Sequence, residues 1–502
     1  MITAHLPILQ VVVPLLAAPV CVLLRRAGAA WLLATATSWV ALLISVLLLR
    51  QVADGGAISY AIGSWAAPWG IEYRIDAVNA LLLVIVSMTG AVVLPYARRS
   101  VAAEIPSDRI YLFYTTFLLC FTGLLGIAAT GDAFNLFVFL EISSLSTYAL
   151  VSLGSDRRAL RAAYQYLILG TIGATFILVG IGLAYMVTGT LNMADLAKLL
   201  PPLEGNRTVR VALAFLTVGI CLKLALFPLH LWLPNAYTFA PSAVSAFIAA
   251  TATKVSVYML LRFLFTVFGG AFAFQAMLLD RALLPLAVLA MFIGSLVAIF
   301  QHDLKRLLAY SSVAQIGYIV LGISLTNLDG VTAGILHLFN HALIKGGMFL
   351  ALGCMALRIG NTRIAHARGL GREMPFTMAA FLVGGFGLIG VPLTAGFISK
   401  WYLIRAALDS GLWPVAALIL ASSLLAVIYV WRVVEVLWFS APEKDRAPVK
   451  EAPAAMLVPT WLLIGASVWF GIDSSAPVEI AREAAALLLG VPVDPGQAAG
   501  TP

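Results

Sequence analysis

Apolar segments long enough to cross a bilayer recur from one end of the chain to the other. A transmembrane helix needs about 20 consecutive, mainly apolar residues. The fourteen segments of this kind are Leu6–Leu24, Trp31–Leu49, Ala77–Tyr96, Ile110–Thr130, Ala133–Leu153, Ala162–Val187, Val209–Leu229, Pro241–Phe268, Leu283–Phe300, Leu307–Ser324, Val331–Leu357, Thr377–Ala407, Trp413–Trp438 and Met456–Ile472. The pattern predicts an all-α polytopic membrane protein with about 14 transmembrane helices.

Basic residues are unevenly distributed between the loops that join these spans. Loops after odd-numbered spans hold 18 lysines and arginines, among them Lys444 and Arg446, whereas loops after even-numbered spans hold eight. Because positively charged loops stay on the cytoplasmic side, we expect the odd loops in the cytoplasm and both termini outside. The tail after Ile472 is expected to form one interfacial turn of helix.

Two of the predicted spans are interrupted by a proline. Pro228 interrupts the seventh span and Pro392 the twelfth, and superposing these prolines carries spans four to eight onto spans nine to thirteen. A shift of five spans turns the second unit over in the membrane, so we predict two inverted five-helix repeats, each with a proline-broken helix. Such breaks persist in lipid only where protein or water satisfies the freed backbone. An internal hydrated region is therefore expected beside Lys223 and Lys400.

The repeat predicts a division of the chain into four parts. Residues 1–109 would form an N-terminal three-helix segment, and residues 110–268 a first half-channel. Residues 283–438 would form a second, inverted half-channel. Residues 439–502 would hold the last span and a short C-terminal tail.

Composition excludes several classes of protein. The chain is 62% hydrophobic and 11% charged, unlike a soluble domain. The net charge of +8 lies in short loops between spans, so nucleic acid is not an expected partner. The four cysteines have no CxxC spacing, and no glycine-rich nucleotide motif occurs in a polar stretch. We therefore expect no metal and no cofactor.

One acid and four lysines fall well inside apolar segments, away from their ends: Glu141, Lys223, Lys254, Lys345 and Lys400. Each costs about 2.5–3.5 kcal/mol near the bilayer centre, and together they would cost on the order of 15 kcal/mol. Intramembrane charges of this kind usually mark ion or proton pathways. The chain is therefore expected to move protons or ions.

Glu141 is interpreted as a proton-binding carboxylate, with Ser144 three residues further on the same helix face. The alternative is a structural ion pair or hydrogen bond between two helices. Four lysines against one glutamate do not fit static neutralisation, because three lysines would have no buried acid. We expect instead a series of lysines, some of them neutral, that exchange protons through water.

His337, His341 and Lys345 follow one another at intervals of four residues and so share a helix face. Histidine changes charge near neutral pH, which suits a proton relay. Two histidines four residues apart could also bind a metal, but no third ligand is evident. A purely structural polar cluster is the other alternative.

The prolines have ionisable neighbours of their own. His230 follows Pro228 and either connects Lys223 with Lys254 or caps the broken helix. Lys400 follows the second break and is expected to end the relay, the alternative being a lysine that extends its ammonium group to the membrane surface.

Five stretches together resemble the antiporter-like proteins shared by Mrp-type cation/proton antiporters, respiratory complex I and membrane-bound hydrogenases. The stretches are Asp132–Glu141, Lys223–Pro234, Pro241–Lys254, His337–Lys345 and Gly390–Lys400. The resemblance covers nearly the whole chain. It implies that Glu141 and Lys223 form the acid–lysine pair of the family. It also implies a central relay of Lys254 with the histidines, and a terminal lysine at Lys400.

Within that family the chain looks most like the D-type protein of the Mrp antiporters. Lys400 differs from the glutamate typical of the M-type complex I protein, and the short tail differs from the L-type protein. The serine-rich stretch after Glu141 departs from the bulkier apolar residues of a typical D-type Mrp protein.

The resemblance implies a transporter subunit rather than an enzyme. It would translocate protons in a multi-subunit monovalent cation/proton antiporter of a bacterial inner membrane, beside other hydrophobic subunits. Three alternatives remain open: a proton-pumping subunit of a redox-driven complex, the membrane partner of an ion-driven inorganic-carbon uptake complex, and a scaffold.

Overall fold

The computed structural model describes residues 2–442 and 448–492, so Lys444 and Arg446 lie outside the described part. Its helices are α1 (Leu6–Leu24), α2 (Ala27–Gly55), α3 (Ala77–Glu104), α4 (Ile110–Ala129), α5 (Ala133–Ser152), α6 (Arg158–Thr188), α7 (Met193–Leu199), α8 (Arg207–Leu224), α9 (Trp232–Phe239), α10 (Ser242–Leu261), α11 (Asp280–Ile299), α12 (Leu304–Ser324), α13 (Leu328–Ile359), α14 (Leu370–Glu373), α15 (Pro375–Ile389), α16 (Ala395–Asp409), α17 (Trp413–Val434), α18 (Ala454–Ile472) and α19 (Ser475–Leu489). Strands β1 (Ile58–Ala61) and β2 (Glu72–Ile75) pair in an antiparallel hairpin.

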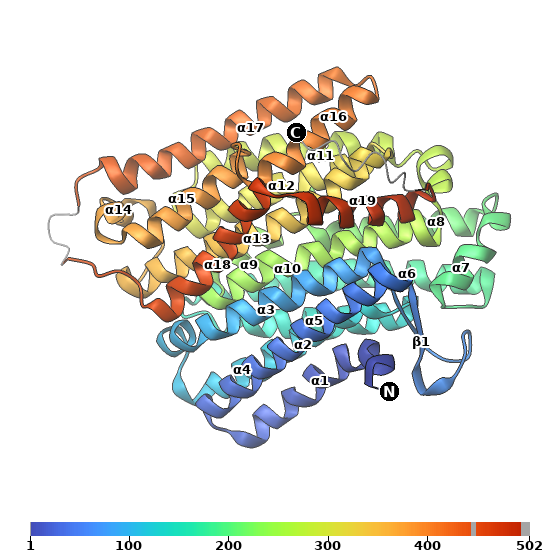
Figure 1. Ribbon diagram of the computed structural model, residues 1–502, viewed down its shortest axis with the longest axis horizontal. Coiled ribbons are helices and arrows are strands. Elements are labelled where there is room, and N and C mark those ends of the chain that lie inside the picture. Colours follow the sequence, from blue (N-terminus) through green and yellow to red (C-terminus); the bar gives the residue numbers. More distant parts are fainter. Residues whose placement is uncertain (1, 443–447, 493–502) are drawn as a thin grey trace.

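The predicted polytopic helical fold is confirmed. In the described residues, 12 helices are long and apolar enough to cross a membrane. The two other predicted spans are the broken pairs α8–α9 and α15–α16. Figure 1 shows the long helices lying side by side through the whole molecule. Their ends differ from the predicted ones, since α2 has 29 residues and α6 has 31.

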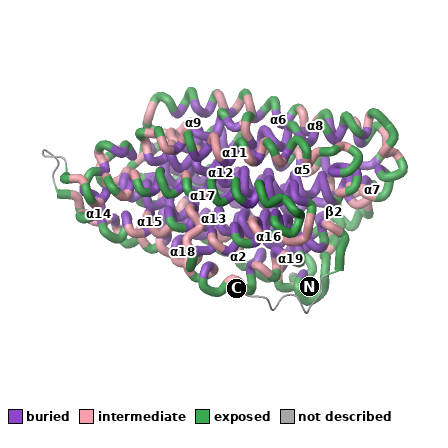
Figure 2. The backbone as a smooth tube through the Cα atoms, turned by 90° about the horizontal axis from the view of Figure 1, so that it is seen from above, coloured by how far each residue is buried: buried purple, intermediate pink, exposed green. Residues whose placement is uncertain are grey.

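Helices α10, α12 and α13 lie in the interior of the bundle. In α10 and α12, 94% of the most apolar window is buried, compared with 39% in α6, α11 and α17. Figure 2 shows buried residues along the middle of the molecule and exposed ones at its rim. α13 packs against α3, α10, α12, α15, α16, α18 and α19. Polar groups on α10, α12 and α13 are therefore far from lipid.

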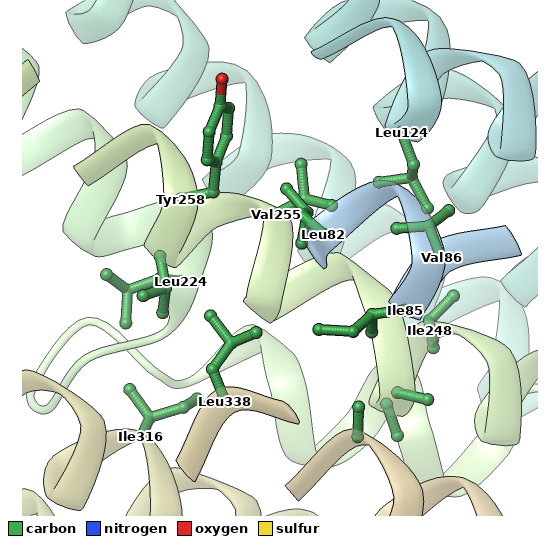
Figure 3. Close-up of a cluster of buried hydrophobic side chains, with 14 of the residues drawn as sticks. Leu82, Ile85, Val86, Leu124, Leu224, Ile248, Val255, Tyr258, Ile316 and Leu338 are labelled. Carbon is green, nitrogen blue, oxygen red and sulfur yellow. The ribbon is translucent and has the colours of Figure 1, made fainter. Parts of the chain in front are cut away.

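Apolar packing closes the space around these inner helices. Figure 3 shows a cluster to which α3, α4, α8, α10, α12 and α13 all contribute. Its labelled members are Leu82, Ile85, Val86, Leu124, Leu224, Ile248, Val255, Tyr258, Ile316 and Leu338, each at most 4% exposed. The ionisable groups of the interior are thus held among tightly packed side chains, where an unpaired charge is costly.

The two five-helix series, α4 to α10 and α11 to α17, share local landmarks. The C-cap residues of α8 and α15, Ala225 and Gly390, both have left-handed backbone (φ 61° and 88°). Asp132 caps the start of α5 and Asp303 the start of α12, each through a hydrogen bond to the backbone N–H three residues on. Each aspartate also forms an isolated antiparallel β-bridge. Asp132 pairs with Asn192, after α6, and Asp303 pairs with Arg363, after α13.

Two features differ from the sequence prediction. The chain was predicted to be all-α, but the stretch between α2 and α3 contains the β1–β2 hairpin. The single turn of helix expected after Ile472 was wrong, because α19 has 15 residues and packs on α13 and α3. Its buried positions Ala481, Ala484, Ala485 and Leu488 follow a helical spacing. Three of these are alanines, so the apolar signal of this helix is weak.

Candidate functional site

The acid and the first lysine approach each other through a serine. Lys223 at the end of α8 is 6% exposed, and its Nζ donates to Ser144 Oγ at 2.9 Å and to Tyr148 Oη at 3.5 Å. Glu141 is half-buried on α5, one turn before Ser144, and its Oε1 has no hydrogen-bond partner. No direct ion pair within 4.0 Å joins Glu141 and Lys223 in the described residues. Ser144, in the serine-rich stretch after Glu141, is therefore the partner of Lys223.

The first helix break lies beside this lysine. Pro228 falls in the seven residues between α8 and α9. The break frees backbone carbonyls at the end of α8, and Trp232 Nε1 donates to one of them, Leu222 O, at 2.9 Å. His230 is 7% exposed, stacks on Phe227, and has an Nδ1 without a partner. No hydrogen bond links it to either neighbouring lysine in the part that the structure describes.

Lys254 lies in the interior of α10. It is 1% exposed, and its Nζ donates to Ala249 O in the same helix. No carboxylate lies within ion-pair distance of it among the described residues. A buried ammonium without a counter-ion is strongly disfavoured, so this site suits a lysine that gives up its proton easily.

The two histidines of α13 have different surroundings. His337 Nδ1 lies 2.8 Å from Ser399 Oγ, and His337 Nε2 lies 2.8 Å from Gln315 Oε1. His341 stacks on it with ring centroids 6.2 Å apart, and neither of its nitrogens has a partner. His337 is therefore fixed between α12 and α16, whereas the His341 ring has two unused polar atoms in a buried setting.

Lys345, one turn further along α13, is fully buried. Its Nζ donates to Leu308 O at 2.8 Å and to Ser311 Oγ, both on α12. The polar face predicted from the spacing of the histidines and this lysine is thus packed against α12.

The second helix break surrounds Lys400. Pro392 lies in the five residues between α15 and α16. Lys400 Nζ donates to Leu388 O and Ile389 O at 2.9 Å each, and to Ser423 Oγ at 3.0 Å. Its ammonium group satisfies carbonyls that the break frees, as the Trp232 indole does at the first break. At 5% exposure Lys400 does not extend to the membrane surface.

Sequence reasoning missed the partners that connect these groups. Gln315, Ser311 and Ser399 bind His337 or Lys345 from α12 and α16. Tyr318 lies 4.5 Å beneath Lys400 Nζ. Serine and glutamine within apolar spans gave a signal on each helix, but which helices face each other is not visible in one sequence.

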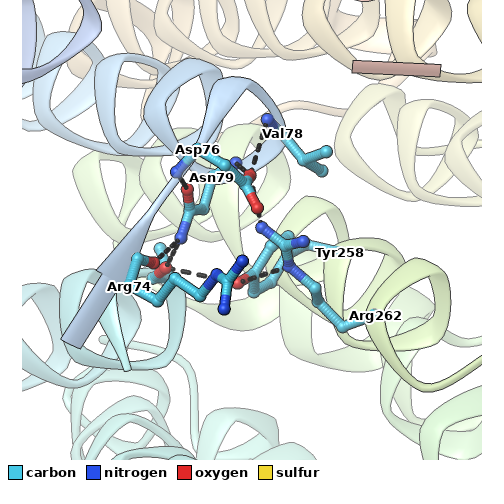
Figure 4. Close-up of polar contacts among 7 residues, drawn as sticks. Arg74, Asp76, Val78, Asn79, Tyr258 and Arg262 are labelled. Carbon is cyan, nitrogen blue, oxygen red and sulfur yellow. Dashed lines mark hydrogen bonds and ion pairs between the residues drawn. The ribbon is translucent and has the colours of Figure 1, made fainter. Parts of the chain in front are cut away.

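A buried ion pair beyond Lys254 was also missed. Figure 4 shows Arg262, which follows α10, directed at the Asp76 carboxylate before α3. The two groups are 2.5 Å apart and 7% exposed, and Tyr258 Oη accepts from Arg262 Nε at 3.1 Å. Asp76 also forms a capping box with Asn79. The spacing of Lys254, Tyr258 and Arg262 by four residues was the available signal, since it places them on one face.

The described residues offer no metal site. They contain no group of three or more histidine, cysteine or acidic side chains placed to hold an ion. Both nitrogens of His337 are already hydrogen-bonded to protein atoms. The arrangement instead holds proton-binding groups next to hydroxyls and amides, which can donate and accept hydrogen bonds.

Comparison with known proteins gives one consistent set of relatives. The family described as "NADH:quinone oxidoreductase/Mrp antiporter, TM" matches residues 130–426. The chain is 44% identical to the N-type subunit of the NADH-quinone oxidoreductase of Desulforudis audaxviator, over 92% of this chain and 94% of that protein. It is 32% identical to the D-type subunit of the Na+/H+ antiporter of Alkalihalophilus pseudofirmus, over 78% of each. A chain in the Mrp complex of Dietzia sp. superposes with a TM-score of 0.89 at 27% identity, covering 97% of this chain and 98% of that chain.

Proposed function

Because the chain belongs to the membrane-subunit family shared by NADH:quinone oxidoreductase and the Mrp antiporters, we propose that it translocates protons in a multi-subunit monovalent cation/proton antiporter. It would work beside other hydrophobic subunits in the bilayer. The observation that carries the proposal is that four lysines are buried without a carboxylate partner in the described part of the chain: Lys223, Lys254, Lys345 and Lys400. All four are at most 6% exposed, and none forms an ion pair within 4.0 Å in the described residues.

This observation argues against a purely structural role for the lysines. A static network of buried charges would pair each ammonium with a carboxylate, because an unpaired buried charge is costly. Here the partners are hydroxyl groups and backbone carbonyls. Each lysine can therefore lose its proton without leaving a buried acid uncompensated, which is what a proton-exchanging group requires.

In the proposed path, a proton binds Glu141 and then passes to Lys223 and, through internal water, to Lys254. The face of α13 that carries His337, His341 and Lys345 accepts it next. A neutral imidazole takes a proton on one nitrogen and releases one from the other. The Ser399 hydroxyl, which precedes Lys400 on α16, lies 2.8 Å from His337, and the proton leaves from Lys400.

Glu141→Ala and Lys223→Ala test this path. Each variant is expected to abolish cation-driven proton flux by the purified complex in proteoliposomes, while the complex still assembles. Glu141→Asp is the matched control, because it retains a carboxylate, and it is expected to keep measurable flux. Flux at the wild-type level in either alanine variant would contradict the path.

A redox-driven proton pump is the second candidate. The identity of 44% to the N-type subunit of an NADH-quinone oxidoreductase favours it. Purification of the tagged native complex in gentle detergent, followed by mass spectrometry, separates the candidates. Small hydrophobic partners alone support the antiporter, and flavin or iron–sulfur subunits support the pump. One large soluble partner would point to an inorganic-carbon uptake complex.

The proposal also covers the cellular membrane that holds the chain, the orientation of its termini and its division into parts. It is a multi-pass membrane protein, and we assign it to the bacterial inner membrane with both termini outside. The four-part division at 1–109, 110–268, 283–438 and 439–502 belongs to the same proposal. Cysteine labelling from each side of sealed vesicles tests the orientation.

A further inference from the structure

A cavity of about 550 Å³ lies where the two five-helix series meet. Its walls come from the ends of α3, α9 and α13 and from the segments that follow α5, α9, α11 and α13, so both series contribute. The basic loops predict that this face is cytoplasmic. The charged residues that line it are Glu104, Asp156, Arg158, Asp303, Lys305 and Arg363.

Lys305 is the buried member of this set. It lies in the first turn of α12, is 5% exposed, and donates from Nζ to Ala240 O at 3.1 Å. The nearby carboxylates are otherwise engaged. Glu104 accepts hydrogen bonds from Ser100 and from the backbone N–H of Ser242. No ion pair within 4.0 Å involves Lys305 in the described residues.

The Asp303 carboxylate is likewise held by other donors. It caps α12 through the N–H of Arg306 at 3.1 Å and accepts from Thr362 Oγ1 at 2.7 Å. Lys305 is therefore a fifth buried lysine without an acid partner among the described residues, and it lies outside the path described above.

A polar face of α12 leads inward from Lys305. Leu308 O and Ser311 Oγ, three and six residues on, accept hydrogen bonds from Lys345. Gln315, ten residues on, binds His337 at 2.8 Å. Steps of three or four residues keep side chains on one helix face. This face thus runs from the cavity to the central histidines.

We propose that the cavity is a second proton intake and that Lys305 is its proton-transfer residue. The inference rests on the proposed function and extends it. A hydronium ion in the cavity gives its proton to the neutral Lys305 amine, forming an ammonium group and water. The ammonium group then passes a proton through intervening water to the neutral amine of Lys345, and Lys305 returns to the amine.

The rim of the cavity suits this role. The carboxylates of Glu104 and Asp156 line the cavity and attract protons. The Arg158 side chain itself is 61% exposed. Arg158 is therefore a second cation of this cavity, and the proposed proton transfer does not involve it.

Substitution of Lys305 is the first test. Lys305→Met is expected to lower cation-driven proton flux by about tenfold or more, because it removes a proton-transfer group. Lys305→Arg keeps a positive charge that does not release its proton, and it is expected to be equally impaired. Arg158→Met is the matched control, expected to retain wild-type flux. Full flux in Lys305→Met, or rescue by Lys305→Arg, would overturn the proposal.

A second test leaves Lys305 in place, in case its variants do not assemble. Ala103 is exposed and lines the cavity, whereas its exposed neighbour Ala102 does not. The four natural cysteines are buried, so an introduced cysteine is the one expected to react. A bulky, membrane-impermeant maleimide is expected to block flux in Ala103→Cys and to leave Ala102→Cys unaffected.

Proton flux by the wild-type complex in the same vesicles distinguishes failure of the antiporter function from failure of the proposed intake. Absence of cation-driven flux in the wild type would contradict the antiporter function. Normal flux in the wild type together with full flux in labelled Ala103→Cys would contradict the intake alone.

Discussion

Removal of one hydroxyl group, by Ser144→Ala, is the most selective perturbation of the acid–lysine pair. Ser144 Oγ is the nearer of two acceptors for Lys223 Nζ, at 2.9 Å, and Tyr148 Oη is the other, at 3.5 Å. The substitution changes neither the charge of the site nor the helix, because alanine has the highest helix propensity. Its effect on transport therefore measures the contact itself.

The expected magnitude follows from the burial of the lysine. A hydrogen bond to a charged group contributes about 1.5–3 kcal/mol. Lys223 is 6% exposed, so bulk water cannot replace the lost partner. The Tyr148 hydroxyl lies at the limit of a hydrogen bond and compensates little. If the protonated lysine is an intermediate of transport, flux falls by about 10-fold to 150-fold, at tenfold for each 1.36 kcal/mol.

The assay is cation-driven proton flux by the purified complex in proteoliposomes, reported by a pH-sensitive dye. Ser146→Ala is the matched control, because the Ser146 hydroxyl donates only to Ile142 O of its own helix at 2.7 Å. We expect a large loss in Ser144→Ala and wild-type flux in Ser146→Ala. Equal flux in the two variants would refute the idea that the Ser144–Lys223 contact supports proton transfer.

Two further predictions separate structure from transport. Arg262→Met breaks the buried pair with Asp76 and is expected to destabilise the protein by about 3–5 kcal/mol. Arg50→Met, which removes an exposed pair, should cost about 0–1 kcal/mol. Thermal unfolding of the purified complex compares them, and equal midpoints would contradict the ranking. His341→Leu is expected to abolish flux without lowering the unfolding midpoint, because neither ring nitrogen has a partner to lose. A lowered midpoint would indicate a structural role.

The spans and their breaks were predictable because lipid imposes a simple rule on length and polarity. All fourteen segments have counterparts, and each broken helix contains its predicted proline. The hairpin and α19 could not be predicted from this rule, which concerns only segments that cross the bilayer. The hairpin depends on pairing Ile58 with Ile75 across a long loop. α19 buries mainly alanines against helices distant in sequence.

The candidate site could be predicted only in part. Ionisable residues in apolar runs identified the lysines, but their partners lie on other helices, as Ser144 does for Lys223, 79 residues away. Lys305 was assigned to a loop because the apolar run begins at Leu307. The helix begins at Leu304, directly after the N-cap Asp303. An N-cap signal at Asp303 would have placed Lys305 inside the helix.

The hydroxyl partners of the lysines explain how a buried amine can change charge without disturbing its surroundings. A carbonyl only accepts hydrogen bonds, whereas a serine hydroxyl accepts from an ammonium group and, after rotation, donates to the lone pair of the neutral amine. Three of the four lysines have such a partner: Ser144 for Lys223, Ser311 for Lys345 and Ser423 for Lys400. Both protonation states are then satisfied in place. At Lys400 the two remaining N–H groups of the neutral amine still serve the carbonyls of Leu388 and Ile389, so loss of the proton leaves the helix break intact.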